Sequence, residues 1–245
     1  MGFWQSVVMD LALKLKSEIH RILRLLAPHH HYSEPLKGSI IEQFHRLYYE
    51  LGEDGKTWQD TRWLGVPVAK LPFDLWVYQE ILFETKPDLL IECGTGKGGS
   101  AYYFACLMDL LGKGRVVTID VIALPERVKH PRIKYITGSS ISPQVVEEVR
   151  KSIGADDSVM VILDSDHSAH HVARELQIYS QFVTKGQYLI VEDTNVNGHP
   201  VYPEHGPGPM EAVNEFIAGT TQFVIDKSRE KYLVSFNPNG YLRRT

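Results

Sequence analysis

The sequence predicts an α/β fold, in which helices flank a seven-stranded, mostly parallel sheet that ends in a C-terminal antiparallel hairpin. Val159–Leu163 and Gln187–Val191 are continuous apolar runs, as is typical of buried parallel strands. Another apolar run stops at Glu92 and enters a glycine-rich turn, which is typical of a strand that presents a nucleotide. Thr221–Asp226 and Lys231–Phe236, two strand-like runs joined by charged residues, predict the hairpin.

The glycine-rich turn after Glu92 is the first candidate binding site. Its glycines allow positive φ and close approach of the backbone, and the helix expected from about Ser100 would aim N–H groups at a ligand. Lys97 is followed by glycine, so the frame of a phosphate-binding loop is missing. A carboxylate directly before the turn would repel a pyrophosphate but attract the ammonium group of S-adenosylmethionine. The predicted cofactor-binding residues here are Glu92, Gly94, Thr95, Gly96, Gly98 and Ser100.

Two further strands, Arg115–Asp120 and Arg132–Ile136, extend the predicted cofactor site. Asp120 ends the first of them, at the distance from the turn where ribose hydroxyls need an acceptor. An aspartate that only caps the next turn is the alternative. Ser139 and Ser140 follow the second strand and are expected to meet the adenine edge, although serine is equally typical of any strand-to-helix turn.

Acidic residues follow the two buried strands that come next along the chain. The first strand leads into Asp164, Asp166 and His167, and the second into Glu192 and Asp193. Because the carboxyl ends of parallel strands share one edge of a sheet, these like charges gather there and favour a divalent cation. Oxygen ligands suit Mg²⁺, Mn²⁺ or Ca²⁺ better than zinc.

In these motifs the chain resembles the cephalosporin hydroxylase and rhamnosyl O-methyltransferase family of S-adenosylmethionine-dependent enzymes. The stretches that carry the resemblance are Leu90–Ala101, Ile162–His167, Val191–Thr194 and Gly206–Val213. The resemblance implies a Rossmann-like class I methyltransferase fold, with Mg²⁺ or Mn²⁺ held by an aspartate after the fourth strand and by Glu192 and Asp193. Asp164 and Asp166 project to the same side of an extended segment, so both are candidates, and an analogy with catechol-type enzymes favours Asp164.

Methyl transfer to oxygen needs a positioned nucleophile and a base that removes its proton. His167 is the candidate base, and Asp164 is the other predicted catalytic residue. A histidine that only orients a carboxylate is the alternative for His167. His170 and His171 fall on the following helix and are expected to be solvated surface.

Two segments outside the sheet are expected to close the site. Asn197–Pro209, rich in proline and glycine, is expected to be a lid on the acceptor side that carries His199, Tyr202 and His205. A passive surface connection is the alternative. Thr57–Val77 contains three tryptophans and is a candidate cover over the cofactor, although core packing explains these residues equally well.

Residues 1–70 form a predicted helical extension, separate from the methyltransferase domain of residues 71–245. Apolar residues recur every three or four positions up to about Ala27, which predicts one long amphipathic helix that ends before Pro28. Its apolar stretches are interrupted too often for a transmembrane span. The helix is expected to pack against the core or a sister subunit, which makes a homo-oligomer plausible, and peripheral contact with a membrane surface is the alternative.

The composition agrees with a cytoplasmic enzyme. The chain has 245 residues, 43% of them hydrophobic, which is enough for one sizeable core. Its net charge of −4 gives no reason to expect nucleic acid as a partner. Cys93 and Cys106 are expected to be buried free thiols.

Together these features predict an O-methyltransferase that uses S-adenosylmethionine and Mg²⁺ to methylate a hydroxyl of a sugar, a glycolipid or another small natural product. Two alternatives stay open: a cofactor-binding partner subunit that turns nothing over, and a component of a hydroxylase or methoxylation system. The carboxylate-rich edge suits Mg²⁺ better than ferrous iron, which counts against the hydroxylase alternative.

Overall fold

The computed structural model describes residue 18 and residues 32–245. Two compact units divide the chain between Ile40 and Ile41, and every element of the site belongs to the second unit. The amphipathic helix predicted up to Ala27 lies outside the described residues except for Glu18. A domain boundary at residue 70 stays a prediction, and residues 41–70 lie in the same compact unit as the sheet.

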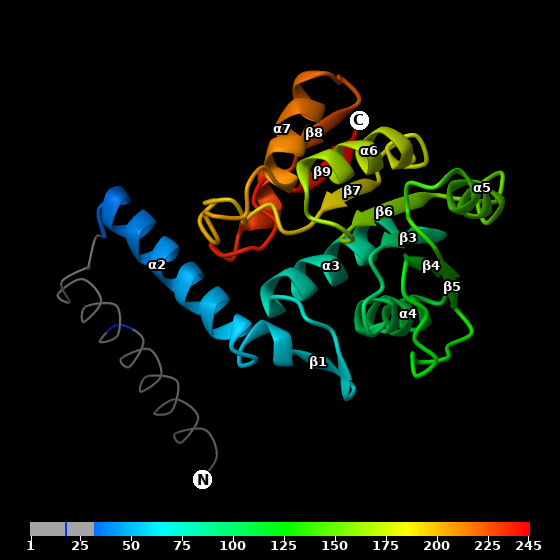
Figure 1. Cartoon of the computed structure of the whole chain (residues 1–245), viewed down its shortest axis with the longest axis horizontal. Helices are drawn as coiled ribbons and strands as arrows, with labels where there is room; N and C mark the ends of the chain where they lie inside the picture. Colours follow the sequence, from blue (N-terminus) through cyan, green and yellow to red (C-terminus); the bar gives the residue numbers. More distant parts are fainter. Residues whose placement is uncertain (1–17, 19–31) are drawn as a thin grey trace, which may run out of the picture. The chain divides into compact units, whose positions relative to one another are not determined.

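The described residues form a sheet of seven strands, which confirms the predicted fold class (Figure 1). Its strand order is β5-β4-β3-β6-β7-β9-β8, in which the first five strands are parallel and β9 runs antiparallel to β7 and β8. The strands are β3 (Leu89–Cys93), β4 (Arg115–Asp120), β5 (Ile133–Thr137), β6 (Val159–Leu163), β7 (Tyr188–Val191), β8 (Phe223–Ile225) and β9 (Tyr241–Arg244). A separate pair joins β1 (Arg62–Trp63) to β2 (Val66–Pro67).

Helices cover both faces of the sheet (Figure 1). The described helices are α2 (Glu34–Glu53), α3 (Pro72–Thr85), α4 (Gly99–Leu111), α5 (Pro143–Lys151), α6 (Ala169–Tyr179) and α7 (Pro209–Ala218), with the 3₁₀ turns η1 (Trp58–Asp60) and η2 (Lys227–Glu230). Neighbouring strand residues alternate between the faces, so Leu90 packs with α3 and α4, whereas Ile91 packs with α5, α6 and α7. Burial on both faces explains why the central strands are continuously apolar.

The strand order reverses between β3 and β6, and the site lies at this point. The chain adds β4 and β5 on one side of β3 and then β6 and β7 on the other, so the carboxyl ends of β3 and β6 border a crevice. Gly94, directly after β3, has a φ of 98°. A Cβ at Gly94 would lie 1.7 Å from the backbone oxygen of Asp164, directly after β6. Glycine is therefore required for the two strand ends to meet.

The C-terminal hairpin is confirmed, but its second strand is not the predicted one. β8 pairs with β9, and the prediction of a strand at Lys231–Phe236 is wrong. Asp74 on α3 is buried and accepts hydrogen bonds from the Ser235 hydroxyl at 2.7 Å and from the backbone N–H of Phe236 at 2.9 Å. Because this carboxylate satisfies the polar groups of the segment, the segment lies against α3 instead of joining a sheet ladder.

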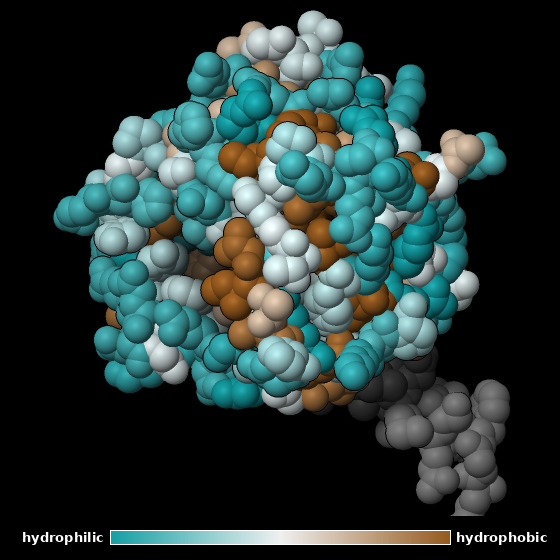
Figure 2. All heavy atoms as spheres, turned by 45° about the vertical axis from the view of Figure 1, so that its right-hand side comes forward, coloured by the Kyte–Doolittle hydropathy of each residue, from teal (hydrophilic) through white to brown (hydrophobic). Residues whose placement is uncertain are grey.

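Hydrophilic side chains dominate the face of the molecule seen in Figure 2, and apolar side chains gather in a band near its middle. Within residues 32–245, no helix is both long enough and apolar enough to cross a lipid bilayer.

Both cysteines are free thiols, as predicted, but the prediction that both are buried is wrong for Cys106. Cys93 is buried at the end of β3, whereas Cys106 on α4 is only half-buried. Burial raises the pKa of the Cys93 thiol well above its usual range, so this residue acts as a small apolar side chain.

Candidate active site

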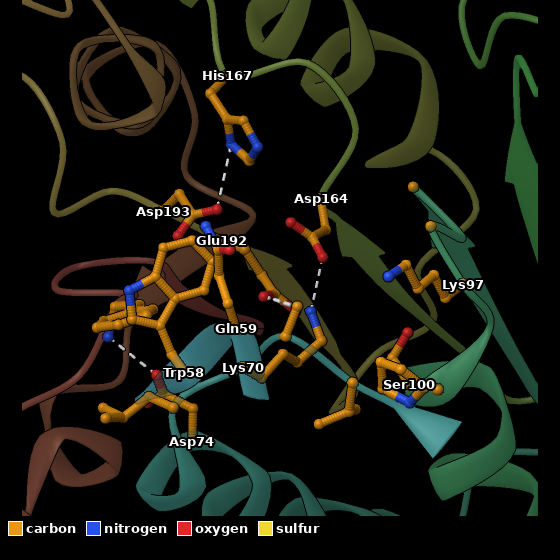
Figure 3. Close-up of a pocket in the computed structure, with 18 of the residues that line it drawn as sticks. Trp58, Gln59, Lys70, Asp74, Lys97, Ser100, Asp164, His167, Glu192 and Asp193 are labelled. Carbon is orange, nitrogen blue, oxygen red and sulfur yellow. Dashed lines mark hydrogen bonds and ion pairs between the residues drawn. The ribbon is translucent and has the colours of Figure 1, made fainter. Parts of the chain in front are cut away.

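A cavity of about 570 Å³ lies at the point where the strand order reverses. Its walls differ in chemistry, as Figure 3 shows. Ser100 lies on the side of the glycine-rich turn, Trp58 lies on the opposite side, and Asp164, Lys70 and Glu192 lie between them. The cavity therefore joins a backbone-rich wall to an aromatic wall across a charged floor.

A second cavity of about 370 Å³ adjoins the first, and the two share Gly94, Gly96 and Asp164. The polar residues that line the second cavity are Asp120, Ser139, Ser140, Ser165, Asp166 and His171. The predicted ribose and adenine contacts thus face one hollow, as a bound nucleoside would require.

The glycine-rich turn lies between β3 and α4 and lines the first cavity with Gly94, Thr95, Gly96 and Ser100. Gly98, also predicted as a contact, is the N-cap of α4 and lines neither cavity. The first N–H groups of a helix have no partner within the helix, so the start of α4 provides free hydrogen-bond donors beside the cavity.

Glu92 lies in β3, is fully buried and lines neither cavity. Its Oε2 accepts a hydrogen bond from the Thr118 hydroxyl at 2.6 Å, and the hydroxyls of Thr118 and Thr95 are also 2.6 Å apart. Its Oε1 has no hydrogen-bond partner among the described residues. Burial raises the pKa of Glu92, although the charge of Lys70 opposes this rise. A positively charged ligand group beside Oε1 would satisfy the carboxylate.

Asp120 lies at the rim of the second cavity, where backbone groups hold its carboxylate. Oδ2 accepts a hydrogen bond from Gly96 N–H at 2.8 Å, and Oδ1 accepts one from Ile122 N–H at 2.9 Å. Arg127, which sequence reasoning missed, lies 3.1 Å from Oδ2. Each carboxylate oxygen can accept two hydrogen bonds, so Asp120 retains capacity for ligand hydroxyls.

His171 is not solvated helix surface, and that prediction is wrong. Its Nε2 lies 3.1 Å from the Ser140 hydroxyl and 3.4 Å from Oε1 of Glu175, which is fully buried. Ser140 itself donates a hydrogen bond to Glu175. The hydrogen bond with Glu175 raises the pKa of His171, against the effect of burial. The buried carboxylate draws His171 toward the second cavity, whereas His170 is exposed, as predicted.

Asp164, His167 and Asp193 form the acidic centre of the first cavity. One ligand atom of each residue lies within 4.8 Å of the others. Nδ1 of His167 is 3.3 Å from Oδ2 of Asp193, an interaction drawn in Figure 3. Two strand ends and one histidine thus present their donor atoms to a common point.

Asp166, the other candidate aspartate, lies outside this group. Its Oδ1 accepts a hydrogen bond from the backbone N–H of Ser168 at 2.8 Å, just before α6 begins at Ala169. The hydrogen bonds with Ser168 lower the pKa of the Asp166 carboxyl. Asp166 therefore stabilises the loop that leads into α6, although it is next to His167 in sequence.

Lys70 is the main site residue that sequence reasoning left undecided. Its buried ammonium group lies 2.6 Å from Oδ2 of Asp164 and 2.6 Å from Oε2 of Glu192. The Tyr78 hydroxyl donates to the other Glu192 oxygen at 2.8 Å. Burial alone would lower the pKa of Lys70, but the charges of Asp164, Glu192 and Glu92 raise it above its ordinary value. Lys70 is therefore a buried cation among carboxylates.

Three aromatic residues, Tyr49, Trp58 and Phe236, form one side of the first cavity, which we call the aromatic wall. The ring centroids of Tyr49 and Trp58 are 5.4 Å apart, and those of Trp58 and Phe236 are 5.9 Å apart. The indole N–H of Trp58 donates to the backbone oxygen of Tyr49 at 3.0 Å. A Cβ at Gly52 would lie 1.8 Å from the indole nitrogen, so the absence of a side chain on α2 makes room for this ring.

The three tryptophans of Thr57–Val77 have different places. Trp58 lines the first cavity, and Trp63 packs against Tyr103 with ring centroids 4.8 Å apart. Trp76 is 58% exposed. Only part of the segment therefore lines the site, and the rest packs elsewhere or faces solvent.

The loop Asn197–Pro209 contributes Tyr202 and His205 to the first cavity. His199 instead lies 2.8 Å from Oε1 of Glu211 at the start of α7 and is not among the cavity residues. The role of this loop as a lid stays a prediction, and two of its three predicted residues are placed where a lid would need them.

Comparison with known proteins identifies the family. The model of the family described as Rhamnosyl O-methyltransferase/CmcI matches residues 55–245. The chain belongs to this family. The rhamnosyl O-methyltransferase of Mycobacterium tuberculosis is 38% identical over 213 residues, which cover 84% of this chain and 85% of that protein. The protein of the same name from Mycobacterium leprae is 37% identical over 212 residues, covering 84% and 91%. The predicted family is thereby confirmed, and with it the enzyme class of O-methyltransferase.

Solved structures of CmcI, which shares the family name, have the same fold. The Mg-SAM form of CmcI superposes with a TM-score of 0.59 at 21% identity, covering 76% of this chain and 77% of that one. The apo form of CmcI also gives a TM-score of 0.59, at 22% identity and the same coverage. These similarities confirm the class I methyltransferase fold.

Two charged residues of this family member carried little signal in the sequence. Lys70 stands between the apolar residues Val68 and Leu71, and a single lysine in such surroundings was the one sign that its side chain turns inward. Arg127 lies in an irregular segment between β4 and β5, where no periodic pattern or motif indicates which way its side chain points.

Proposed function

We propose that this O-methyltransferase transfers a methyl group from S-adenosylmethionine to a hydroxyl of a sugar, with Mg²⁺ bound at the acidic centre. The observation that carries the proposal is the placement of Asp164, His167 and Asp193 between a nucleoside-sized hollow and the aromatic wall. The names of the relatives support a sugar acceptor, and the Mg-SAM form of CmcI supports the two cofactors.

The residues present fit S-adenosylmethionine. The free Oε1 of Glu92 is a buried acceptor beside the glycine-rich turn, and it suits the ammonium group of the cofactor. Asp120 would hold the ribose hydroxyls, while Ser139 and Ser140 line the place for adenine. The Gly94 turn brings the backbone close enough for the cofactor to lie over the strand ends.

The donor atoms at the acidic centre fit Mg²⁺ or Mn²⁺. Asp164 and Asp193 offer carboxylate oxygens, which hard divalent cations prefer. Glu192 is outside this group of donor atoms and contacts the ammonium group of Lys70 instead. Among the two candidate aspartates, this placement favours Asp164, since Asp166 is engaged with the backbone before α6.

His167 is the proposed base. When bound, S-adenosylmethionine supplies an electrophilic methyl group, and Mg²⁺ supplies a Lewis acid that orients an acceptor oxygen. Asp193 holds Nδ1 of His167, which leaves Nε2 free to take the proton of an acceptor hydroxyl. His167 receives that proton as the oxygen bonds to the methyl carbon and the bond from this carbon to sulfur breaks. Positioning and proton removal are thus the work of the protein.

The aromatic wall supports a sugar acceptor. Trp58 is fixed in place by its hydrogen bond to Tyr49 and by the space at Gly52, so it offers a rigid flat surface. Sugar rings have faces of C–H groups that pack on aromatic rings, while their hydroxyls need polar partners, which Tyr202 and His205 provide nearby.

An acceptor screen tests this proposal. Transfer of isotope-labelled methyl from S-adenosylmethionine would be measured with rhamnosides, other glycosides and catechols, in the presence of Mg²⁺ or EDTA. We expect methylation of a glycoside that requires Mg²⁺ and is lost in Asp193→Asn. Preference for a catechol would contradict the sugar acceptor. Tight cofactor binding without transfer to any acceptor would indicate a partner subunit instead.

A further inference from the structure

We propose that Lys70 is an internal counter-ion of the metal site, which holds Asp164 and Glu192 together before the metal binds and competes with the metal for their oxygens. The inference rests on the proposed function, because it concerns the cation bound at the same carboxylates. It assigns Lys70 a positioning role and a role in setting metal affinity, and it leaves the chemical steps to other residues.

The contacts of Lys70 carry the inference. The ammonium group bridges β6 and β7, since it lies 2.6 Å from Asp164 and 2.6 Å from Glu192. The side chain of Lys70 is only 4% exposed, so water screens these contacts little. Figure 3 shows the side chain reaching up from the floor of the cavity toward Asp164.

Glu192 is fixed at both oxygens. Oε2 meets Lys70 at 2.6 Å, and Oε1 accepts a hydrogen bond from Tyr78 at 2.8 Å. This explains why Glu192 is not part of the group formed by Asp164, His167 and Asp193, although it was predicted as a metal ligand together with Asp193. For Glu192 to bind a metal directly, its contact with Lys70 must give way.

The negative charges around Lys70 explain the role of its contacts with Asp164 and Glu192. Four carboxylates, those of Glu92, Asp164, Glu192 and Asp193, gather around the carboxyl ends of three strands, β3, β6 and β7. Like charges so close together repel each other unless cations lie between them. Among the described residues, Lys70 is the lysine or arginine that forms an ion pair with Asp164 or Glu192. A divalent cation at these oxygens would therefore meet an ammonium group that already occupies two of them.

Lys70→Met, which removes the charge and keeps a flexible apolar side chain, tests the inference. Lys97→Met is the matched control, because Lys97 lines the same cavity without a contact to these carboxylates. Binding of Mn²⁺ would be followed by electron paramagnetic resonance without S-adenosylmethionine, and melting temperatures would be recorded in EDTA and in saturating Mg²⁺.

We expect Lys70→Met to tighten Mn²⁺ binding by about 10-fold or more, because the metal no longer displaces an ammonium group from the oxygens of Asp164 and Glu192. The variant should melt earlier than the wild type in EDTA and recover most of the difference in Mg²⁺, whereas Lys97→Met should behave as the wild type. Unchanged or weaker Mn²⁺ binding by Lys70→Met would overturn the inference.

Two further measurements keep the test decisive. If Lys70→Met does not fold without metal, Lys70→Gln prepared in Mg²⁺ and then stripped with EDTA replaces it, with the same expected direction. Binding of Mn²⁺ by the wild type separates the two proposals. If the wild type binds no Mn²⁺, the metal in the proposed function fails, whereas binding that is insensitive to Lys70 overturns only the present inference.

Discussion

The two sides of the active site are built in different ways. The cofactor side consists of strand ends and the turn after β3, where the parallel register of β3 with β4 and β6 fixes Glu92, Asp120 and Asp164. The acceptor side consists of side chains from distant segments, such as Trp58 from η1 and Tyr202 from the loop before α7. Backbone geometry positions the first side, whereas packing between segments positions the second.

This difference predicts how the two sides respond to substitution. In the proposed function, residues at the strand ends hold the cofactor or the metal, so their loss should lower the rate of methyl transfer. The aromatic wall is proposed to contact only the acceptor, so the loss of its residues should weaken acceptor binding and leave cofactor binding intact. The following predictions test that separation, from the largest expected effect to the smallest.

The largest effect is expected at Asp164, and Asp166 provides a matched control. Asp164→Asn should lower kcat/KM by about 10³-fold, because the several kcal/mol of stabilisation that a metal supplies depend on this carboxylate. Asp166→Asn should leave kcat/KM nearly unchanged, because the amide oxygen of asparagine can accept the same hydrogen bond from the Ser168 N–H. Steady-state kinetics over a Mg²⁺ titration would measure both. A larger loss in Asp166→Asn would make Asp166 the metal ligand.

His167→Gln is expected to lower kcat by about 10²- to 10⁴-fold, the usual contribution of a general base. His170→Gln is the control, because His170 is exposed on α6. Affinity for S-adenosylmethionine and Mg²⁺ should be unchanged in both variants. Added imidazole should restore part of the lost rate if His167 removes a proton. If the variant instead loses Mg²⁺ affinity and imidazole has no effect, His167 orients a carboxylate and is not the base.

The sequence predicted the strands and the turn of the cofactor side because their signals are local. The run that ends at Glu92, the glycines after it and the position of Asp120 follow from rules about strands and turns that span a few residues. The sequence also predicted that Asp164, His167 and Asp193 lie at one edge of the sheet, since parallel strands deliver their carboxyl ends there, but it placed Glu192 among the metal ligands, whereas Glu192 contacts Lys70. The choice between Asp164 and Asp166 needed coordinates, because it depends on which carboxylate the backbone of Ser168 engages.

The acceptor side and the charged partners could not be predicted in this way. Trp58 reaches the cavity because Gly52 leaves room for the indole and Phe236 packs against it. Phe236 is far from Trp58 in sequence. Lys231–Phe236 is not the predicted strand, because hydrogen bonds to Asp74 hold this segment against α3. Pairings between distant segments leave no periodic trace in a single sequence.

Trp58→Ala should raise KM for the acceptor by about tenfold, in keeping with the loss of one aromatic contact. Trp76→Ala is the control, because Trp76 is 58% exposed and does not line the cavity. Calorimetry should give the same affinity for S-adenosylmethionine in the wild type and both variants. A change in cofactor affinity in Trp58→Ala would show that the two sides are not separate.

The smallest effect is expected for His171, through the dependence of stability on pH. The pKa of His171 is raised in the folded state above its ordinary value of 6.5, chiefly by its hydrogen bond with Glu175. Its stabilising contribution is therefore complete below pH 6.5 and is lost as the pH rises through the folded-state pKa. His171→Gln should melt about 2 °C below the wild type near pH 5.5 and close to it near pH 9.

For that prediction, differential scanning calorimetry across the pH range gives the comparison. The control is His170→Gln, whose melting temperature should follow that of the wild type at every pH, since His170 is exposed. A difference between His171→Gln and the wild type that grows with rising pH would contradict the assigned contact with Glu175.

The central claim is that the turn after Glu92 binds S-adenosylmethionine, and calorimetry tests it most directly. The wild type and Glu92→Gln would be titrated with S-adenosylmethionine and with NAD, each with and without Mg²⁺. We predict micromolar affinity of the wild type for S-adenosylmethionine, none for NAD, and binding about tenfold weaker or more in Glu92→Gln, because the ammonium group loses its charged partner. Preference for NAD, or equal affinity of Glu92→Gln for S-adenosylmethionine, would contradict the account.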